Sequence, residues 1–378
     1  MTTGRNISTE LYFGLTGLRQ LESGWRDLER RVDKLAYFHA FCWYEAALKS
    51  GLIDETKTIF ITASNGDELV GILPLQQLRS WKFFLPFDSL CFLDSPHMIL
   101  RDAVLDRDWV NRVSIADLAS WLRKESRVRW DTLACSLMPA NGCLAMLGTG
   151  SKSRLQLDYQ GSGSAIIPCS GTSEENLEHM SARFKRNLRR LKRKAEKIGA
   201  VSLCSYSDAA GRNAAIQKFI NIEHSGWKGI EGGSIASSVE TTEFYRNLAS
   251  NEDSAANCRI HMLKIGDEYV AGQFGFVSQG VFHLLKIAYR EEYADVGPGT
   301  VLLNLVIDEF SRSAVIKKIN LVTKPAWSAP WQAGEESTKT IQLFNFTPGG
   351  IYLYCQTRLI NFLRKARLNI ASSEGQIS

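Results

Sequence analysis

The stretch from residue 281 to residue 310 constrains the fold of this 378-residue chain more than any other. Residues 281–288 are mostly apolar or β-branched, which predicts a strand. Gly297-Pro298-Gly299 then breaks the chain, and Thr300 stands where an N-cap is expected before an apolar pattern with helical spacing. Strand, turn and helix in this order predict a crossover connection to a further strand.

The turn in this crossover has the features of a phosphate site. Glycines let the backbone approach an anion closely, and the first N–H groups of a helix point toward it with the helix dipole behind them. Pro298 fixes its own φ and stiffens the turn. We therefore expect Gly297, Pro298, Gly299 and Thr300 to bind a cofactor phosphate. The alternative is an ordinary crossover whose loop contains glycine and proline.

Composition places the chain among soluble globular proteins, with 44% hydrophobic and 22% charged residues. Its length fits two domains. We find no apolar run near the ~18 residues that a membrane span needs, and no charged-then-apolar signal at the start. The eight cysteines are scattered without zinc-site spacing, so we expect reduced thiols, no metal and a cytoplasmic location. The modest net charge of +5 suits an anionic small ligand.

Both halves of the chain show the same order of expected elements: helices, an antiparallel meander, a helix and a strand. In the first half we expect helices at 21–31, 38–49 and 106–125, and strands at 58–63, 68–75, 83–93 and 130–137. In the second half we expect helices at 182–198, 209–224 and 244–248, strands at 201–206, 259–265, 269–277, 281–288, 316–322 and 340–346, the crossover helix, and a closing amphipathic helix at 351–368.

Gly161-Ser162-Gly163-Ser164 reads as a domain boundary or a surface loop, and we place the division there, with domains of residues 1–160 and 161–378. A strand that leads through a helix to the next strand implies one parallel pair in an otherwise antiparallel sheet. The prediction is thus an α/β fold with a mixed sheet that splays where the parallel pair begins. An extended cofactor with a pyrophosphate fits such a gap.

Several motifs, in this order, resemble those of a known superfamily. The N-terminal half contains Phe38-His-Ala-Phe-Cys-Trp43 and Glu68-Leu-Val-Gly-Ile-Leu-Pro74-Leu75. The C-terminal half contains a basic helix at 183–199, Glu223-His-Ser-Gly226-Trp227-Lys228-Gly229, and Lys286-Ile-Ala-Tyr289 before the Gly-Pro-Gly turn. The chain resembles two tandem domains of the GCN5-related N-acetyltransferase (GNAT) fold, the C-terminal one more complete. It is most similar to the CelD/BcsL-type acyltransferases of cellulose and exopolysaccharide biosynthesis, relatives of the Fem peptidyltransferases.

Three positions depart from the family pattern. Tyr289 is followed by Arg290 instead of Asp, and Asn320 stands where many relatives carry Asp. Ala294 occupies the place of the Gln or Arg in the usual pyrophosphate motif, although Gly297 and Gly299 fit it.

The resemblance implies transfer of an acyl group from acetyl-CoA or a longer acyl-CoA to a sugar- or amine-bearing acceptor, in polysaccharide or envelope-related biosynthesis. Two alternatives remain open. One is a Fem-type aminoacyl transferase. The other is a non-catalytic GNAT-like scaffold that binds an anionic partner or a membrane surface through its basic helix.

Acyl transfer requires a base for the acceptor, donors for the oxyanion and a proton for the leaving thiolate. Glu223 is the candidate base, with a surface charge at a helix end as the alternative. Lys286 interrupts an apolar strand, where a cation is unfavourable unless it is paired or functional. Tyr289 is the candidate proton donor.

We expect Trp227, Lys228 and Trp327 to contact the substrate. The alternatives are a core residue for Trp227, a solvated charge for Lys228 and a loop anchor for Trp327. The basic helix lacks interleaved aromatic side chains, which argues against nucleic acid. We expect a small-molecule or glycan acceptor instead.

Overall fold

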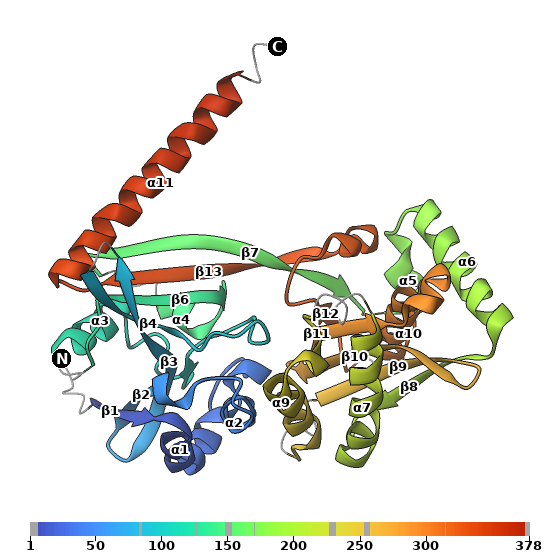
Figure 1. Cartoon of the computed structure of the whole chain (residues 1–378), viewed down its shortest axis with the longest axis horizontal. Coiled ribbons are helices and arrows are strands. Elements are labelled where there is room, and N and C mark those ends of the chain that lie inside the picture. The colour runs from blue at the N-terminus through green and yellow to red at the C-terminus, as the bar shows by residue number, and fades with distance from the viewer. Residues whose placement is uncertain are drawn as a thin grey trace.

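The computed structural model describes residues 7–82, 85–124, 128–147, 153–169, 171–226, 232–252, 258–313 and 315–374, with side chains of the last helix up to Arg364. Within these residues one 13-stranded mixed sheet runs through the whole molecule (Figure 1). The sheet order is β1-β2-β3-β4-β6-β13-β7-β12-β11-β10-β9-β8, with β5 beside β3. The predicted mixed α/β fold is confirmed.

The first half supplies one end of this sheet. Its elements are β1 (Ile7–Phe13), α1 (Gly14–Glu29), η1 (Tyr37–His39), α2 (Phe41–Lys49), η2 (Glu55–Lys57), β2 (Thr58–Asn65), β3 (Glu68–Lys82), β4 (Leu85–Phe92), β5 (Val104–Leu105), α3 (Ile115–Lys124), β6 (Thr132–Pro139), α4 (Cys143–Leu147) and β7 (Gln156–Pro168).

The second half supplies the other end. Its elements are α5 (Ser173–Glu178), α6 (Ala182–Ile198), β8 (Val201–Tyr206), α7 (Ala209–Ser225), η3 (Ile235–Ser237), α9 (Val239–Ser250), β9 (Cys258–Ile265), β10 (Glu268–Ser278), β11 (Val281–Tyr289), η4 (Glu291–Val296), α10 (Pro298–Ser313), β12 (Lys318–Asn320), η5 (Ala326–Trp331), β13 (Gly334–Phe344) and α11 (Pro348–Glu374).

The two halves exchange strands where they meet. β7 pairs with β12 of the second half, and β13 pairs with β6 of the first half as well as with β7. The two long strands therefore cross the top of the molecule side by side in Figure 1. The predicted surface loop at 161–164 is wrong, because these residues lie inside β7, where Thr338 Oγ1 donates to the Ser162 carbonyl at 2.8 Å. The predicted division between residues 160 and 161 falls within this strand and stays a prediction.

One apolar core also extends across both halves. Helix α2 packs on α9, and the Trp43 ring meets Phe244 edge-on with centroids 5.1 Å apart. Tyr37 stacks on Phe276 of β10 at 5.4 Å. A second core lies under α5, α6 and α10 on the other face of the second half. Aromatic contacts of this kind stabilise beyond the area they bury, so they add to the packing of the two halves against each other.

Helix ends show where local sequence was sufficient and where it was not. The predicted helix at 182–198 is confirmed as α6, since the Ser181 hydroxyl accepts from the Phe184 N–H at 3.1 Å. The predicted helix at 106–125 is wrong in its first half, because α3 begins only at Ile115. The strand predicted at 316–322 shortens to the three residues of β12.

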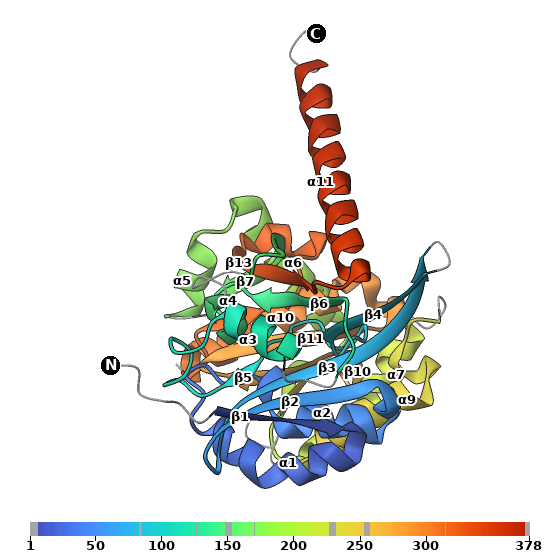
Figure 2. The same cartoon turned by 90° about the vertical axis from the view of Figure 1, so that its left-hand side faces the viewer.

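The last helix is longer than predicted and leaves the body of the protein. Helix α11 begins at Pro348 and has 27 residues, which corresponds to a length of about 40 Å. Both views show it projecting away from the sheet (Figures 1 and 2). Among the described residues, no helix combines the length and apolar character needed to cross a bilayer.

The strand exchange can be tested at Gly161. A Cβ added there would lie 2.3 Å from Thr338 Oγ1, whereas a Cβ at Gly334 on β13 would lie 3.8 Å from the nearest atom. Gly161→Val should lower the free energy of unfolding by about 1–3 kcal/mol, measured by urea denaturation, because it forces β7 and β13 apart. Gly334→Val is the matched control and should stay within about 0.5 kcal/mol of wild type. Equal stability of wild type and Gly161→Val would contradict the close β7–β13 contact.

Candidate active site

The parallel pair predicted from the sequence is present and very short. Strand β11 pairs with β12 only from Val281–Lys318 to His283–Asn320. Beyond Asn320 the chain turns away, because Val322 has a left-handed backbone with φ of 53°. The Asn320 Oδ1 accepts from the Val322 N–H at 2.7 Å and holds this conformation, which is unfavourable for a β-branched residue. The predicted splay therefore begins after His283 and Asn320.

A second hydrogen bond of Asn320 gives a physical reason for an amide at this position. Asn320 is buried, and its Nδ2 donates to Glu336 Oε2 at 3.2 Å. An aspartate there would place two carboxylates in contact. An asparagine in place of the family's aspartate at position 320 therefore avoids repulsion from the Glu336 carboxylate.

A β-bulge lies just past the apex of the splay. On β10, Phe274 pairs with Lys286 and Gly275 pairs with Leu284, so Leu285 of β11 is an extra residue. A bulge leaves the backbone of its extra residue outside the regular ladder. The backbone near Leu285 can thus offer an N–H group to a ligand lying in the gap.

The Gly-Pro-Gly turn follows the free end of β11. Gly297 has φ of 58°, in the left-handed region that favours glycine, and an added Cβ would meet Leu191 Cδ1 of α6 at 2.8 Å. Helix α10 begins at Pro298, and the N–H groups of Thr300 and Val301 both donate to the Gly297 carbonyl at 3.0 Å. Thr300 lies in the first helical turn, so its predicted N-cap position is wrong. Around Gly299 there is room, since the nearest atom to an added Cβ is Ile287 Cδ1 at 3.7 Å.

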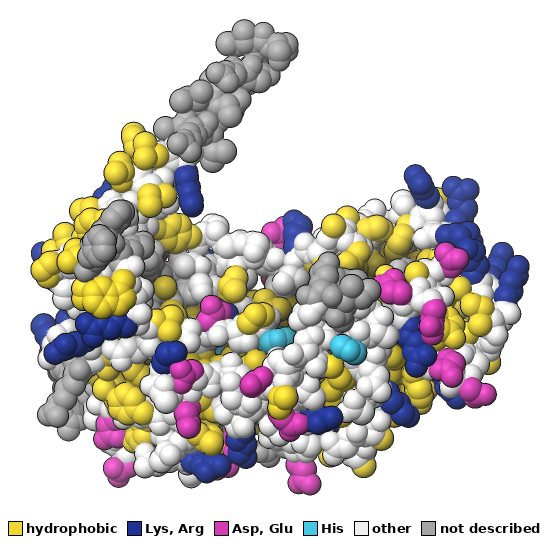
Figure 3. Space-filling view, in the orientation of Figure 1, with side chains coloured by type: hydrophobic (Ala, Val, Ile, Leu, Met, Phe, Trp, Pro, Cys, Tyr) yellow, Lys and Arg dark blue, Asp and Glu magenta, His cyan; other side chains and the backbone are white. Residues whose placement is uncertain are grey.

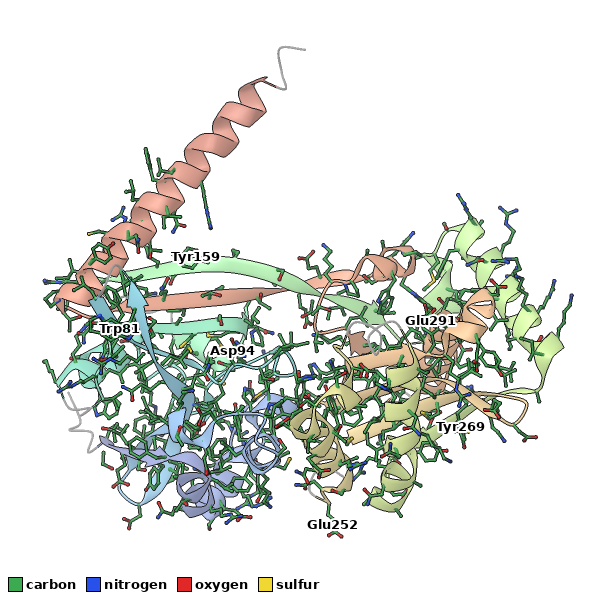
Figure 4. The ribbon with its side chains drawn as sticks, in the orientation of Figure 1. Trp81, Asp94, Tyr159, Glu252, Tyr269 and Glu291 are labelled. Atoms are coloured by element: carbon green, nitrogen blue, oxygen red, sulfur yellow. The ribbon has the colours of Figure 1, made fainter. Side chains whose placement is uncertain are left out.

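A cavity of about 430 Å³ lies between this turn, the end of β11 and the η5 segment. Seven of the ten residues predicted for the site line it: Glu223, Tyr289, Gly297, Pro298, Gly299, Thr300 and Trp327. Ile287, Glu291, Ala294 and Trp331 are among the other lining residues, and Figure 4 labels Glu291 beside α10. Trp227 and Lys228 lie outside the described residues.

Glu223 is not the surface charge considered as its alternative. Its side chain is 2% exposed, and Oε2 accepts from the Ile235 N–H at 2.7 Å. The carboxylate therefore holds η3 against the end of α7 at the wall of the cavity. A buried carboxylate bordering a cavity is a candidate base.

The structure separates Lys286 from Tyr289. Ile287 and Tyr289 face the start of α10, whereas the Lys286 Nζ lies 6.0 Å from the Tyr245 ring centroid on the α9 side. Lys286 is not among the residues that line the 430 Å³ cavity. The burial of Tyr289, together with the Glu291 carboxylate, raises the pKa of its phenol, so it carries its proton at neutral pH.

A second cavity, of about 520 Å³, lies between the two halves on the other side of the apex. His283 and Asn320, the last paired residues, both line it. His283 is 8% exposed, and its Nδ1 has no hydrogen-bond partner among the described residues. Burial, with smaller effects from Lys318 and His39, lowers the pKa of His283 to about 3. The imidazole is therefore neutral and can accept a hydrogen bond from a ligand.

Sequence reasoning missed His283, although a histidine within an apolar strand was a signal that could have been used. Polar groups from both halves accompany it in the larger cavity. They include Arg107, Asn111, Asn141, Ser278, Gln279, Lys318 and Glu336.

His39, Asp102 and Cys143 also meet at this cavity, with ligand atoms within 4.8 Å of one another. Their hydrogen bonds favour a structural role over a metal site. His39 Nδ1 accepts from the Ala36 N–H, so its proton sits on Nε2, 3.7 Å from Asp102 Oδ2, and leaves no lone pair there for a metal. The Asp102 oxygens accept from the N–H groups of Ala103, Cys143 and Leu144.

Comparison with known families bears on this arrangement. Residues 182–325 match the acetyltransferase (GNAT) domain family. The match covers 144 of the 378 residues, so the likeness to this family is found in this part of the chain. The matched range contains the splay, the bulge, the Gly-Pro-Gly turn and the residues that line the 430 Å³ cavity except Trp327 and Trp331. The match marks the protein as an enzyme of the acyltransferase class. No curated protein matches the sequence.

Solved structures share the fold at low sequence identity. A conserved protein of unknown function from Bacteroides thetaiotaomicron superposes with a TM-score of 0.51 and 11% identity over 87% of this chain and 97% of that one. FemX gives a TM-score of 0.51 and 12% identity over 84% and 95%. L-PGS from Bacillus licheniformis gives 0.50 and 11% over 90% and 96%. At these identities the likeness shows the fold alone, and it extends over both halves.

The buried imidazole of His283 makes a prediction about pH. Its pKa of about 3, against an ordinary value of 6.5, means that between these pH values only the unfolded chain binds the extra proton. Stability should therefore fall as pH drops below about 6.5. Between pH 7 and pH 5, the unfolding free energy of the His283→Gln variant should fall by about 2 kcal/mol less than that of wild type, measured by urea denaturation. The exposed His179 is the control, and equal pH dependence in His283→Gln and His179→Gln would contradict the assignment.

Proposed function

We propose that the protein transfers an acyl group from acyl-CoA to a sugar- or amine-bearing acceptor. The observation that carries the proposal is a pair of cavities along β11, one between the halves at His283 and one beside the Gly-Pro-Gly turn at Ile287–Tyr289. The bulge at Leu285 lies between these two positions on the strand. A donor in one cavity and an acceptor in the other would approach the bulge from its two ends.

The residues around the turn suit the phosphates of CoA. An α-helix leaves its first N–H groups without helical acceptors, and in α10 the Gly299 N–H is the one left for a ligand, because Pro298 has none and those of Thr300 and Val301 bond to Gly297. Leu191 of α6 packs directly on Gly297. This contact is made by the buried apolar stripe of α6, whereas most of its basic side chains, the dark-blue group at the upper right of Figure 3, are exposed, and none of them lines the cavity. We therefore assign phosphate binding to the backbone of the turn.

The chemical step uses Glu223 and Tyr289, which line the same cavity, and the backbone of the bulge on β11. The buried Glu223 carboxylate takes a proton from the acceptor amine or hydroxyl, whose N or O then bonds to the acyl carbon. A backbone N–H at the Leu285 bulge stabilises the oxyanion. When the C–S bond breaks, the Tyr289 phenol gives its proton to the departing thiolate. Lys286, on the α9 side of the strand and outside this cavity, is assigned to positioning the acceptor.

The larger cavity fits the acceptor by its chemistry. Its hydroxyl, amide and imidazole groups come from both halves and match a ligand with several hydroxyl or amino groups. We assign acceptor binding to this cavity, with His283 accepting one hydrogen bond, and place the reaction in the cytoplasm. The sugar acceptor and the CelD/BcsL type rest on the sequence motifs.

Calorimetric titration with acetyl-CoA and longer acyl-CoAs tests the donor. Binding of at least one, followed by thiol release in the presence of amino sugars or amines, is the expected result. If no acyl-CoA binds to the folded protein, the proposal is wrong.

Gly299→Val should weaken acyl-CoA binding and raise KM about tenfold or more, because the added methyl groups fill the space beside Ile287 and Tyr289. Since the same contact holds donor and product CoA, kcat should change less. Gly334→Val is the control, because an added Cβ there meets nothing closer than 3.8 Å. Unchanged acyl-CoA affinity in a folded Gly299→Val would place the phosphates elsewhere.

Glu223→Gln separates a base from a structural support. The amide oxygen can still accept from the Ile235 N–H but cannot take a proton. We expect kcat to fall by roughly a hundredfold or more, with acyl-CoA affinity and unfolding free energy close to wild type. A kcat within about threefold of wild type would leave Glu223 a structural residue only.

A further inference from the structure

Exposed apolar side chains gather at one end of the molecule. Of the fifteen large hydrophobic residues exposed in the described chain, nine lie on α11, just before it, or at the tip of the β3–β4 hairpin. They are Trp81, Leu85, Phe346, Ile351, Tyr352, Leu359, Ile360, Phe362 and Leu363. Large apolar groups that cluster on a surface mark an interaction site. We call this set the α11 patch.

Helix α11 and the hairpin form one continuous surface. Tyr352 of α11 stacks on Phe87 of β4, with centroids 6.0 Å apart and ring planes at 18°. Figure 4 labels Trp81 beside the base of the helix, and Trp81 is 67% exposed. Asn361 Nδ2 still reaches Tyr159 OH of β7 at 3.1 Å, but Phe362 beyond it is 68% exposed. From about Asn361 onward the helix extends away from the body of the protein, so the body does not cover its apolar side chains there.

Charge indicates what covers the patch. From Pro348 to Arg364 the helix has no acidic residue, and Arg358 and Arg364 are both exposed. Two copies of α11 packed together along residues 348–364 would bring these arginines into an apolar interface with no carboxylate in that stretch to pair with them. Anionic lipid headgroups supply the missing negative charge, while the interfacial layer accepts the apolar and aromatic groups.

We propose that the α11 patch docks on an anionic membrane surface. Leu359, Phe362 and Leu363 enter the headgroup layer, the two arginines meet lipid phosphates, and Trp81 sits at the level of the headgroups where tryptophan is favoured. The helix lies on the membrane and does not cross it. This docking does not depend on the acyl-transfer proposal.

Co-sedimentation of the full chain with vesicles tests the docking. The protein should bind phosphatidylcholine vesicles containing about one third phosphatidylglycerol at least tenfold more tightly than phosphatidylcholine alone, and high salt should weaken the binding. Phe362→Glu should reduce binding to the anionic vesicles at least tenfold. Val239→Glu is the matched control, because Val239 is 75% exposed on the distant α9, and it should bind like wild type.

A charge control distinguishes the patch from bulk positive charge. Replacing Arg358 and Arg364 together by Glu should reduce binding roughly tenfold or more. The same double change at Arg189 and Arg193 of α6 should reduce it far less. Equal losses in the two double variants would overturn the proposal. The proposal would also be overturned if wild type did not bind vesicles and instead formed a dimer, seen by analytical ultracentrifugation, that Phe362→Glu dissociates. Circular dichroism of each variant excludes unfolding as the cause.

Discussion

The short pairing of β11 with β12 is the constraint on which the rest of the site depends. Three residue pairs hold the strands together, and the left-handed backbone of Val322, fixed by Asn320, then sends the chain away from β11. A longer parallel pair would close the gap with ladder hydrogen bonds. Because it stops at His283, the free end of β11 and the start of α10 face one space, and the bulge lies on β11 just before it.

The exchange of β7 and β13 explains how two halves make one site. Each strand extends the other half's sheet, and a shared aromatic core locks α2 against α9. The apex of the splay therefore faces the first half across a cavity rather than solvent. The first half contributes no part of the GNAT domain match at 182–325, yet it forms one wall of the cavity assigned to the acceptor.

Local patterns predicted the elements that local chemistry determines. Helix α6 has its cap, its apolar stripe and its terminal glycine within one stretch, and the strand-turn-helix at 281–310 reads directly as a crossover. Strand β7 was missed because its glycines and serines look like a loop, and only the distant Thr338 and the rest of β13 complete it. The separation of Lys286 from Tyr289 could have been predicted, because both follow the bulge at Leu285 and residues three apart on a strand point to opposite faces.

Hydrogen exchange with and without CoA tests most directly that the splay is the donor site. Saturating CoA should slow exchange of the backbone amides at Gly299–Val301 and Ile287–Tyr289, because they border the 430 Å³ cavity. Amides of β2 and β3, in the first half, should not change. Protection confined to the first half, or no protection around Gly299 at saturation, would contradict the account.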